Sequence, residues 1–234
     1  MDPRILCFDT SIDVCSVALS GTEQRITYKE ERGINLHASR LNLIIESIIQ
    51  EAGISFKELD AICVCKGPGS YTGLRIGVSS AKGLCYALDK PLLSINSLEI
   101  MAKLAIKNIK EPEKNALLCP MIDARRMEVY SAAFDMNGAF VSETKAEVVD
   151  ELYMKDELAS HPVYFFGNGM AKCRNLLETS PHARFIDEAI YPRADYMAIE
   201  AIKKYHAGNF EELFTFEPFY LKDFYTTAGS QHLK

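Results

Sequence analysis

The 234-residue sequence lacks an excess of positive charge, which limits its contact with nucleic acid. Its 26 lysines and arginines are outnumbered by 32 aspartates and glutamates, and the formal net charge is −6. Neutralising phosphates requires clustered Lys and Arg. We therefore do not expect the chain to bind nucleic acid by itself. A local basic patch stays open, and a role with RNA would need a partner that supplies charge.

No apolar stretch is long enough to span a bilayer, and no signal peptide is recognisable. The first residues, Met1 to Leu6, pass directly into strand-like sequence. With 48% hydrophobic and 25% charged residues, the composition is that of an ordinary globular protein. We expect a cytoplasmic protein that does not contact a membrane.

The sequence also lacks a cysteine framework. Its seven cysteines are odd in number and lie mostly in apolar runs. Cys63 and Cys65 alternate on a predicted strand, so their side chains point to opposite faces and cannot chelate one ion together. We expect buried, reduced thiols that act as small hydrophobic side chains, in preference to a metal or redox site.

Hydrophobic periodicity predicts three strands and then alternating helices and strands in the first half of the chain. For example, Leu41, Ile44 and Ile48 form an apolar stripe at helical spacing, and Gly53 ends that helix. The predicted strands are 5–9, 14–19, 24–30, 61–65 and 91–95, and the predicted helices are 35–51, 72–88 and 98–107.

The same order of elements recurs after a polar break at 111–115. The predicted strands are 117–123, 128–135, 139–148, 163–166 and 184–186, and the helices are 152–159, 170–178 and 195–206. A β-β-β-α-β-α-β-α unit that occurs twice is an internal repeat, and it is the layout of the actin-like ATPase (ASKHA, Hsp70 and sugar-kinase) superfamily. The predicted fold class is α/β with two actin-like lobes. Residues 1–110 form the first lobe, with a glycine loop and docking helices, and residues 111–234 form a reduced second lobe and a C-terminal tail.

Two loops are candidates for binding an anion, and the first ends the first strand. In the actin-like superfamily a carboxylate and a turn at this place face a nucleotide phosphate. The hydroxyls of Thr10 and Ser11 would donate to a phosphate, and Asp9 would hold a hydrated magnesium ion. Alternatively, Asp9 and Thr10 cap the first hairpin through side-chain hydrogen bonds to the backbone. Both interpretations stay open.

The second loop, Gly67-Pro68-Gly69-Ser70-Tyr71-Thr72-Gly73, joins a buried strand to a helix. Its glycines permit a close backbone approach, and the free N–H groups of the helix favour an anion. It is not a Walker A motif, because Lys66 precedes the glycines. The alternative is that Ser70 or Thr72 is a plain N-cap. The residues expected to face a nucleotide or another anion are Asp9, Thr10, Ser11, Gly67, Gly69, Ser70 and Thr72.

The helix beyond this loop carries small residues at four-residue spacing. Gly73, Gly77 and Ala81 share one face, which lets another backbone approach closely. Each glycine costs about 1 kcal/mol relative to alanine in a helix, so the pair needs a packing or functional reason. Packing inside the lobe explains one face, but apolar residues on other faces favour a subunit interface. The predicted docking residues are Leu36, Leu43, Gly73, Arg75, Ile76, Gly77, Ser80, Ala81 and Leu84.

Several strings of the sequence resemble the TsaB (YeaZ) family. They are ILCFDTS at 5–11, GPGSYTGLRIGV at 67–78, AKGL at 81–84, DARRMEVY at 123–130 and PFYLK at 218–222, in this order. The resemblance is dense in the first half and patchy in the second. The GPGS-x-TGLR-x-G string is specific, unlike a lone G-x-G-x-x-G.

The resemblance implies a role in making threonylcarbamoyladenosine at the adenosine beside the anticodon of certain tRNAs. It implies a non-catalytic subunit that binds the catalytic paralogue TsaD, with the ATPase TsaE as third partner, and that forms homodimers through the first-lobe helices. The chain would then reach tRNA only through the complex. No cofactor would be bound stably, although ATP or ADP at the complex interface stays open.

The main alternatives are enzymes. TsaD-like chains, which carry an older glycoprotease-like metallopeptidase label, have two metal-binding histidines four residues apart. The matching positions here are Ser97 and Met101, which suit no hard or borderline divalent ion. The five histidines are scattered and no G-x-S-x-G elbow is present, so we assign no catalytic or metal-ligating residue.

Two further questions stay open at this stage. A stand-alone actin-fold ATPase or small-molecule kinase is suggested by Asp9 and the glycine loop, although the second lobe looks too small to enclose an adenosine. Asp123, Arg125 and Arg126 lie at a strand end, where they would bind an anion or form a salt bridge between the lobes, and we prefer the bridge.

Overall fold

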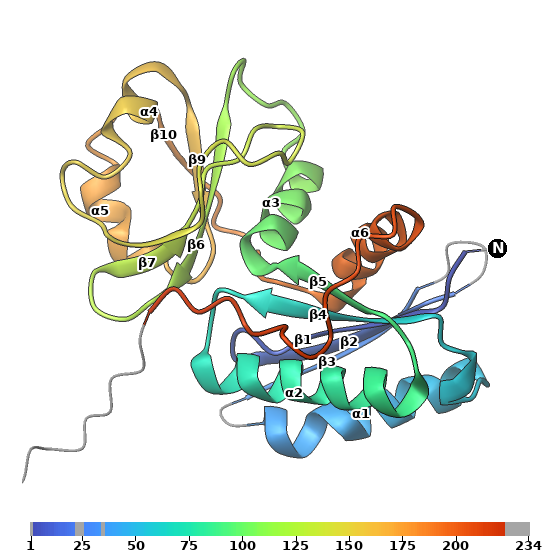
Figure 1. Cartoon of the computed structure of the whole chain (residues 1–234). Coiled ribbons are helices and arrows are strands. Elements are labelled where there is room, and N and C mark those ends of the chain that lie inside the picture. The colour runs from blue at the N-terminus through green and yellow to red at the C-terminus, as the bar shows by residue number, and fades with distance from the viewer. Residues whose placement is uncertain (1, 22–25, 34–35, 223–234) are drawn as a thin grey trace, which may run out of the picture.

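Two five-stranded sheets, one in each half of the chain, form the framework of the protein (Figure 1). The computed structural model describes residues 2–21, 26–33 and 36–222. The first sheet has the order β3-β2-β1-β4-β5, with β1 antiparallel to β2 and parallel to β4. Its strands are β1 (Ile5–Asp9), β2 (Val14–Ser20), β3 (Ile26–Arg32), β4 (Ala61–Gly67) and β5 (Leu92–Asn96).

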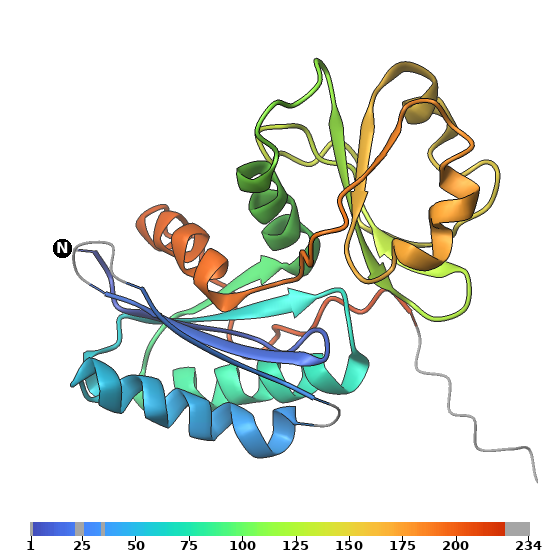
Figure 2. The same cartoon turned by 180° about the vertical axis from the view of Figure 1, so that it is seen from behind.

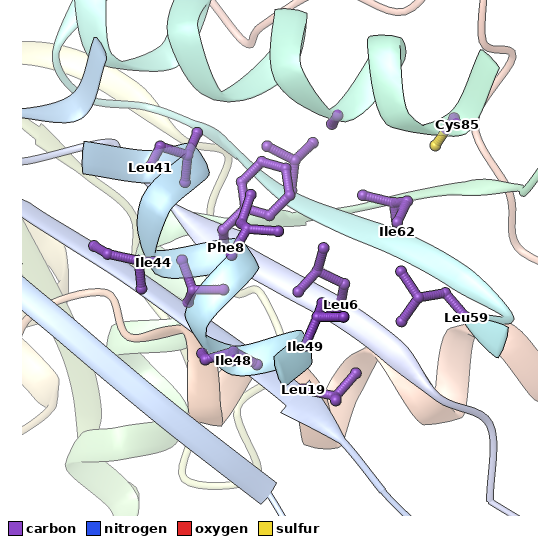
Figure 3. Packing of buried hydrophobic residues seen from close by; sticks show 14 of the residues in the cluster. Leu6, Phe8, Leu19, Leu41, Ile44, Ile48, Ile49, Leu59, Ile62 and Cys85 are labelled. Carbon is purple, nitrogen blue, oxygen red and sulfur yellow. The ribbon is translucent and has the colours of Figure 1, made fainter. Parts of the chain in front are cut away.

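Two helices, α1 (His37–Ala52) and α2 (Tyr71–Leu88), cover one face of the first sheet, and the short 3-10 turn η2 (Phe56–Glu58) follows α1 (Figure 1). The buried side of α1 is the apolar stripe predicted from the sequence. Its Ile44 and Ile48 pack over Leu6 and Phe8 of β1 (Figure 3). Burying such a side chain contributes about 1.5–3 kcal/mol, so this layer holds α1 on the sheet.

The second sheet repeats the topology of the first. Its order is β10-β9-β6-β7-β8, with β6 antiparallel to β7 and parallel to β9. Its strands are β6 (Leu117–Asp123), β7 (Glu128–Ser131), β8 (Lys145–Val148), β9 (Val163–Phe166) and β10 (Ala183–Phe185). The helical segments are α4 (Lys155–Ser160), η3 (Ala171–Cys173) and α5 (Arg174–Leu177). The predicted duplication of a β-β-β-α-β-α-β-α unit is thus confirmed.

The second and third strands of this sheet are shorter than predicted. We expected strands at 128–135 and 139–148, whereas the ladder between them covers only β7 and β8. Phe134, beyond the end of β7, exchanges two backbone hydrogen bonds of 2.8 and 2.9 Å with Leu118 of β6. Both side chains are fully buried in one core, so burial of the Phe134 ring accompanies this change of partner. The predicted strand start at 24–25 and helix start at 35 lie outside the described residues.

The last helix of each unit packs on the sheet of the other unit. α3 (Ser97–Asn108) follows β5 but contacts β6, and its Leu98 shares a core with Phe166. α6 (Ala194–His206) follows β10 but covers the face of the first sheet opposite to α1 and α2 (Figures 1 and 2). We had grouped each helix with the sheet before it. The division into domains at 110 and 111 stays a prediction, since it follows the sheets but not these helices.

Small side chains allow α6 to lie close to the first sheet. Met197 is the largest fully buried residue that α6 contributes. The small members of this core are Cys7, Ala18, Ala61, Cys63, Cys65, Ala194, Ala198 and Ala201.

All seven cysteines are free and buried, which confirms the prediction made for them. None of the helices in the described ranges is both long and apolar enough to cross a bilayer.

The segment after α6 crosses back over the first lobe and then reaches the second (Figure 1, red). Lys82 of α2 donates from Nζ to the carbonyl oxygens of Phe214 and Phe216, at 3.1 and 3.0 Å. The backbone N–H of Phe219 donates to the carbonyl of Lys66, at 2.8 Å. The predicted C-terminal tail is therefore already in contact with the first lobe at Phe214.

Met197→Ala tests whether α6 is part of the core of the first sheet. Met197 is fully buried there, so its truncation should lower the free energy of unfolding by about 2–5 kcal/mol. Ile199→Ala is the control, because Ile199 on the same helix is exposed and its truncation should change stability by less than about 0.5 kcal/mol. Urea unfolding measures both. Equal effects would contradict the packing of α6 described here.

Candidate functional site at the first turn and the glycine loop

The turn that follows β1 is closed by its own hydrogen bonds. Asp9, at the carboxyl end of β1, accepts hydrogen bonds from the backbone N–H of Ser11 at 3.1 Å and from the Ser11 hydroxyl at 2.9 and 3.2 Å. Asp9, Thr10 and Ser11 are all fully buried. The carboxylate therefore holds the backbone of its own turn, which is the arrangement of an Asx turn.

Burial makes the Asp9 carboxyl a weaker acid than an exposed one. Loss of solvation raises the pKa of its carboxyl from 3.8 to about 6, against the opposing effect of hydrogen bonds from Cys65 and Ser11. The carboxyl thus changes its protonation state within the range in which many proteins work. Such a group marks either a functional site or a structural network, and its contacts favour the second.

The glycine loop packs directly on this turn. The backbone N–H of Ser70 donates to the carbonyl of Ser11 at 2.6 Å. A Cβ at Gly69 would lie within 3 Å of the Ser11 backbone, so only glycine permits this approach. Gly67 has φ +102° and is buried, with the Leu74 side chain against it. The loop therefore fills the space in front of the turn.

The small-residue face of α2 also packs on the turn. The Thr10 hydroxyl donates to the carbonyl of Gly73 at 2.7 Å. A Cβ at Gly73 would clash with the Thr10 carbonyl, and one at Gly77 would clash with the Thr10 hydroxyl, each within 3 Å. Ala81, one turn further on, is fully buried in the core of the first lobe.

These contacts correct the prediction of a docking face. The interpretation of Gly73, Gly77 and Ala81 as a partner-facing stripe is wrong, because the close approach that they permit is made by the chain's own first turn. Leu36, Ile76, Ser80 and Leu84 are half-buried. Leu43, 50% exposed, and Arg75 do face solvent, and so does Tyr86 of α2, 74% exposed, which the sequence analysis missed.

The contacts also correct the prediction of an anion site. Asp9, Thr10 and Ser11 do not face solvent, and Gly67 and Gly69 are used for internal packing. Ser70 is the N-cap of α2, since its hydroxyl accepts from the backbone N–H of Gly73 at 3.3 Å. The capping alternative is therefore confirmed for Asp9 and Ser70. Ser70 and Thr72 are exposed, and their contact with an anion stays a prediction.

The positions matched to the metal-binding histidines of TsaD-like chains make structural contacts. Ser97, the first residue of α3, is fully buried, and its hydroxyl donates to the carbonyl of Pro68 at 2.6 Å. Met101 lies in the core shared with the second sheet and would clash with a Cβ at Gly167. These two side chains do not fit a divalent metal. Within the ranges that the structure describes, no three His, Cys, Asp or Glu residues gather as a metal would require.

The acidic residues at the end of β6 and the start of β7 pair within their own lobe or with the C-terminal segment. Asp123 forms an ion pair with Lys172 of η3, and Glu128 forms one with Lys222. The preferred prediction, a salt bridge between the lobes through Asp123, is therefore wrong.

Two shallow hollows, of about 490 Å³ between α4 and α5 and about 270 Å³ between β3 and α1, lie away from the first turn and the glycine loop.

Comparison with known proteins matches the chain to proteins named for the threonylcarbamoyl modification of tRNA adenosine. A family model described as "TsaD: tRNA N6-adenosine threonylcarbamoyltransferase" matches residues 21–226. The chain is 30% identical to the tRNA threonylcarbamoyladenosine biosynthesis protein TsaB of Escherichia coli, over 94% of this chain and 95% of that protein. It is also 30% identical to TsaB of Bacillus subtilis, over 80% of this chain and 76% of that protein.

Two solved structures from Pseudomonas aeruginosa resemble the whole fold. One is a protein described as similar to peptidase YeaZ, with a TM-score of 0.80 and 28% identity, covering 94% of this chain and 100% of that one. The other is YeaZ itself, with a TM-score of 0.77, 27% identity and the same coverage.

Gly73→Ala tests the contact between the first turn and α2. In an open helix this substitution adds about 1 kcal/mol of stability. At Gly73 the new Cβ would meet the backbone carbonyl of Thr10, so we expect a loss of about 3 kcal/mol instead. Gly83→Ala is the matched control on the same helix, since no atom lies within 4 Å of its Cβ position, and it should gain about 1 kcal/mol. Urea unfolding distinguishes the two, and a gain in both variants would contradict the contact.

Asp9→Asn tests the buried carboxyl. Because the pKa of Asp9 rises from 3.8 to about 6 on folding, the folded state binds more protons than the unfolded state between these values. Stability should therefore fall as the pH rises from about 4 to about 6 and then level off, by about 3 kcal/mol in all. The Asn variant cannot ionise, so this part of the pH dependence should disappear. Urea midpoints measured from pH 4 to 7 compare the two proteins, and parallel curves would contradict titration of Asp9 in this range.

Proposed function

The chain belongs to the TsaB (YeaZ) family, within the wider group that the TsaD family model describes, and we propose that it acts as a non-catalytic subunit in the modification of tRNA. The relatives are named for the biosynthesis of threonylcarbamoyladenosine. The proposed role is to support transfer of the threonylcarbamoyl group to the adenosine beside the anticodon, with a TsaD-like paralogue carrying out the reaction.

The contacts of Ser97 and Met101 are the observation that carries this proposal. A catalytic paralogue needs metal-binding side chains at these positions, whereas here one hydroxyl is bonded to the glycine loop and one thioether fills a core. Neither side chain can turn outward without losing its contact. We therefore place the transfer chemistry on the partner and a positioning role on this chain.

The hydrogen bonds that close the first turn favour binding of a nucleotide only together with a partner. The hydroxyl of Thr10 donates to α2 and the carboxylate of Asp9 accepts from its own turn, so neither is available to a phosphate or its magnesium ion. A stand-alone ATPase or kinase would need both groups. ATP or ADP would instead be held where this chain meets its partners, the TsaD-like paralogue and a TsaE-like ATPase.

The outer side of α1 and α2 is the docking surface that we propose. Leu43 and Tyr86 expose large apolar side chains there. The two side chains stand on helices that contact each other, and an exposed apolar patch marks a contact surface. The same surface would serve a homodimer of the isolated chain, and tRNA would be reached only through the complex.

A deletion strain tests both the function and the surface. Loss of the gene should remove threonylcarbamoyladenosine from tRNA, as nucleoside analysis would show, and the wild-type chain should restore it. The Leu43→Glu/Tyr86→Glu variant should fail to restore it and should not co-elute with the TsaD-like paralogue on gel filtration, because two charges would be buried at the contact. Ile199→Glu is the control, since Ile199 is an exposed apolar residue of α6 on the opposite side of the sheet.

Two outcomes would overturn parts of this proposal. If tRNA from the deletion strain keeps the modified nucleoside, the proposed function is wrong. If the double variant restores the modification and co-elutes like the control, the function stands but the docking surface lies elsewhere.

A further inference from the structure

We propose that a band of arginine and tyrosine side chains, formed by Arg125, Arg126, Tyr220, Tyr71 and Arg75, binds single-stranded RNA of the tRNA anticodon loop. This inference rests on the proposed function, and it names residues of this chain that would contact the substrate of the complex. We call these five residues the arginine–tyrosine band.

The first part of the band is the turn between β6 and β7. Arg125 and Arg126 have φ values of +73° and +50° and are both exposed. Gly and Asn are favoured in the left-handed region, because they adopt it with least strain. Two consecutive arginines in this region are unusual, and their exposed guanidinium groups are free to serve a role other than the turn itself.

The charge of these arginines is not cancelled by their neighbours. Among the described residues, neither guanidinium forms a hydrogen bond or an ion pair. The two nearest carboxylates in the chain, Asp123 and Glu128, already have lysine partners in Lys172 and Lys222. The turn therefore presents two free positive charges, although the net charge of the whole chain is −6.

The second part of the band is aromatic. The rings of Tyr71, at the start of α2, and Tyr220, in the C-terminal segment, have centroids 4.8 Å apart and are tilted by 32°. Arg75 lies over Tyr71, with its guanidinium carbon 5.6 Å from the ring centroid. Tyr220 is 38% exposed. An exposed tyrosine beside an arginine provides both a stacking surface for a base and a cation for a phosphate.

The C-terminal segment joins the two parts. The Phe219 N–H bonds to Lys66 before the glycine loop, and Lys222 Nζ donates to the carbonyl of Ala124 at 3.3 Å, next to Arg125. Lys222 thus ties the segment that carries Tyr220, two residues earlier, to the β6–β7 turn. In both views this segment passes from the first lobe to the ends of β6 and β7 (Figures 1 and 2).

Single-stranded RNA fits this arrangement better than a duplex does. Its unstacked bases lie on aromatic side chains while arginines contact the backbone phosphates. A duplex would be read by its shape and its phosphates and would not use the tyrosines. Because phosphate contacts release counterions, the arginines should give binding a measurable dependence on salt. The net charge of −6 of the whole chain is consistent with a contact that acts as part of a complex.

The test measures binding of an unmodified tRNA transcript to the complex of this chain with its TsaD-like paralogue, over a series of salt concentrations. Arg125→Ala/Arg126→Ala should weaken binding about tenfold and reduce the slope of log affinity against log salt by about 2. Arg125→Lys/Arg126→Lys should restore the slope. Tyr220→Ala should weaken binding about tenfold with an unchanged slope, and Tyr220→Phe should not.

Lys57→Ala/Lys110→Ala is the matched control, because it removes two exposed charges elsewhere on the surface and should leave binding unchanged. If the arginine variant binds tRNA with the affinity and slope of this control, the inference is wrong. If the arginine variant instead loses the paralogue on gel filtration, the band is a protein contact and the inference is also wrong. Failure of either kind leaves the loss of modified nucleoside on gene deletion unaffected, so it is distinguishable from failure of the proposed function.

Discussion

The approach of the Thr10–Ser11 backbone to the start of α2 is the contact on which the first lobe depends. Gly69 and Gly73 let two backbones meet at a distance that any side chain would prevent. This contact closes the turn after β1, buries Asp9, and fixes the glycine loop, whose Pro68 carbonyl then accepts the hydroxyl of Ser97. One close approach thereby connects the first strand, α2 and the beginning of α3. It also explains why the place where an actin-like fold would meet a phosphate is occupied by the protein's own atoms.

Much of the fold could be predicted from the sequence, because strand alternation and helical stripes are local patterns. The duplicated order of elements and the buried side of α1 followed from them directly. The packing of α3 and α6 could not be predicted, because a helix with alanines and a methionine on one face fits any sheet with a small-residue face. The small-residue face of the first sheet became visible only once Cys63 and Ala198 were found in one core, and α3 instead shares a core with Phe134 and Phe166.

The candidate site shows the same limit. Spacing identified Gly73, Gly77 and Ala81 as a face of close approach, and this was right, but spacing carries no information on what approaches. The residue that approaches is Thr10, about sixty positions earlier in the sequence. The same holds for Arg125 and Arg126, whose sequence pattern permits an ion pair. Only the tertiary structure shows that the lysines Lys172 and Lys222 had taken the available carboxylates.

The exchange of the last helices has a consequence for the order in which the chain is made. About a hundred residues separate the end of β5 at Asn96 from the start of α6 at Ala194, which covers the second face of the first sheet. A ribosome needs about 5 to 20 s to add them. During that time Cys7, Ala61 and Cys63 have no covering helix, and the nascent first lobe presents a bare sheet to its surroundings. That face also carries the larger apolar side chains of Ile5, Leu93 and Ile95, so until α6 is made the sheet presents an apolar surface that a chaperone or another nascent chain can bind.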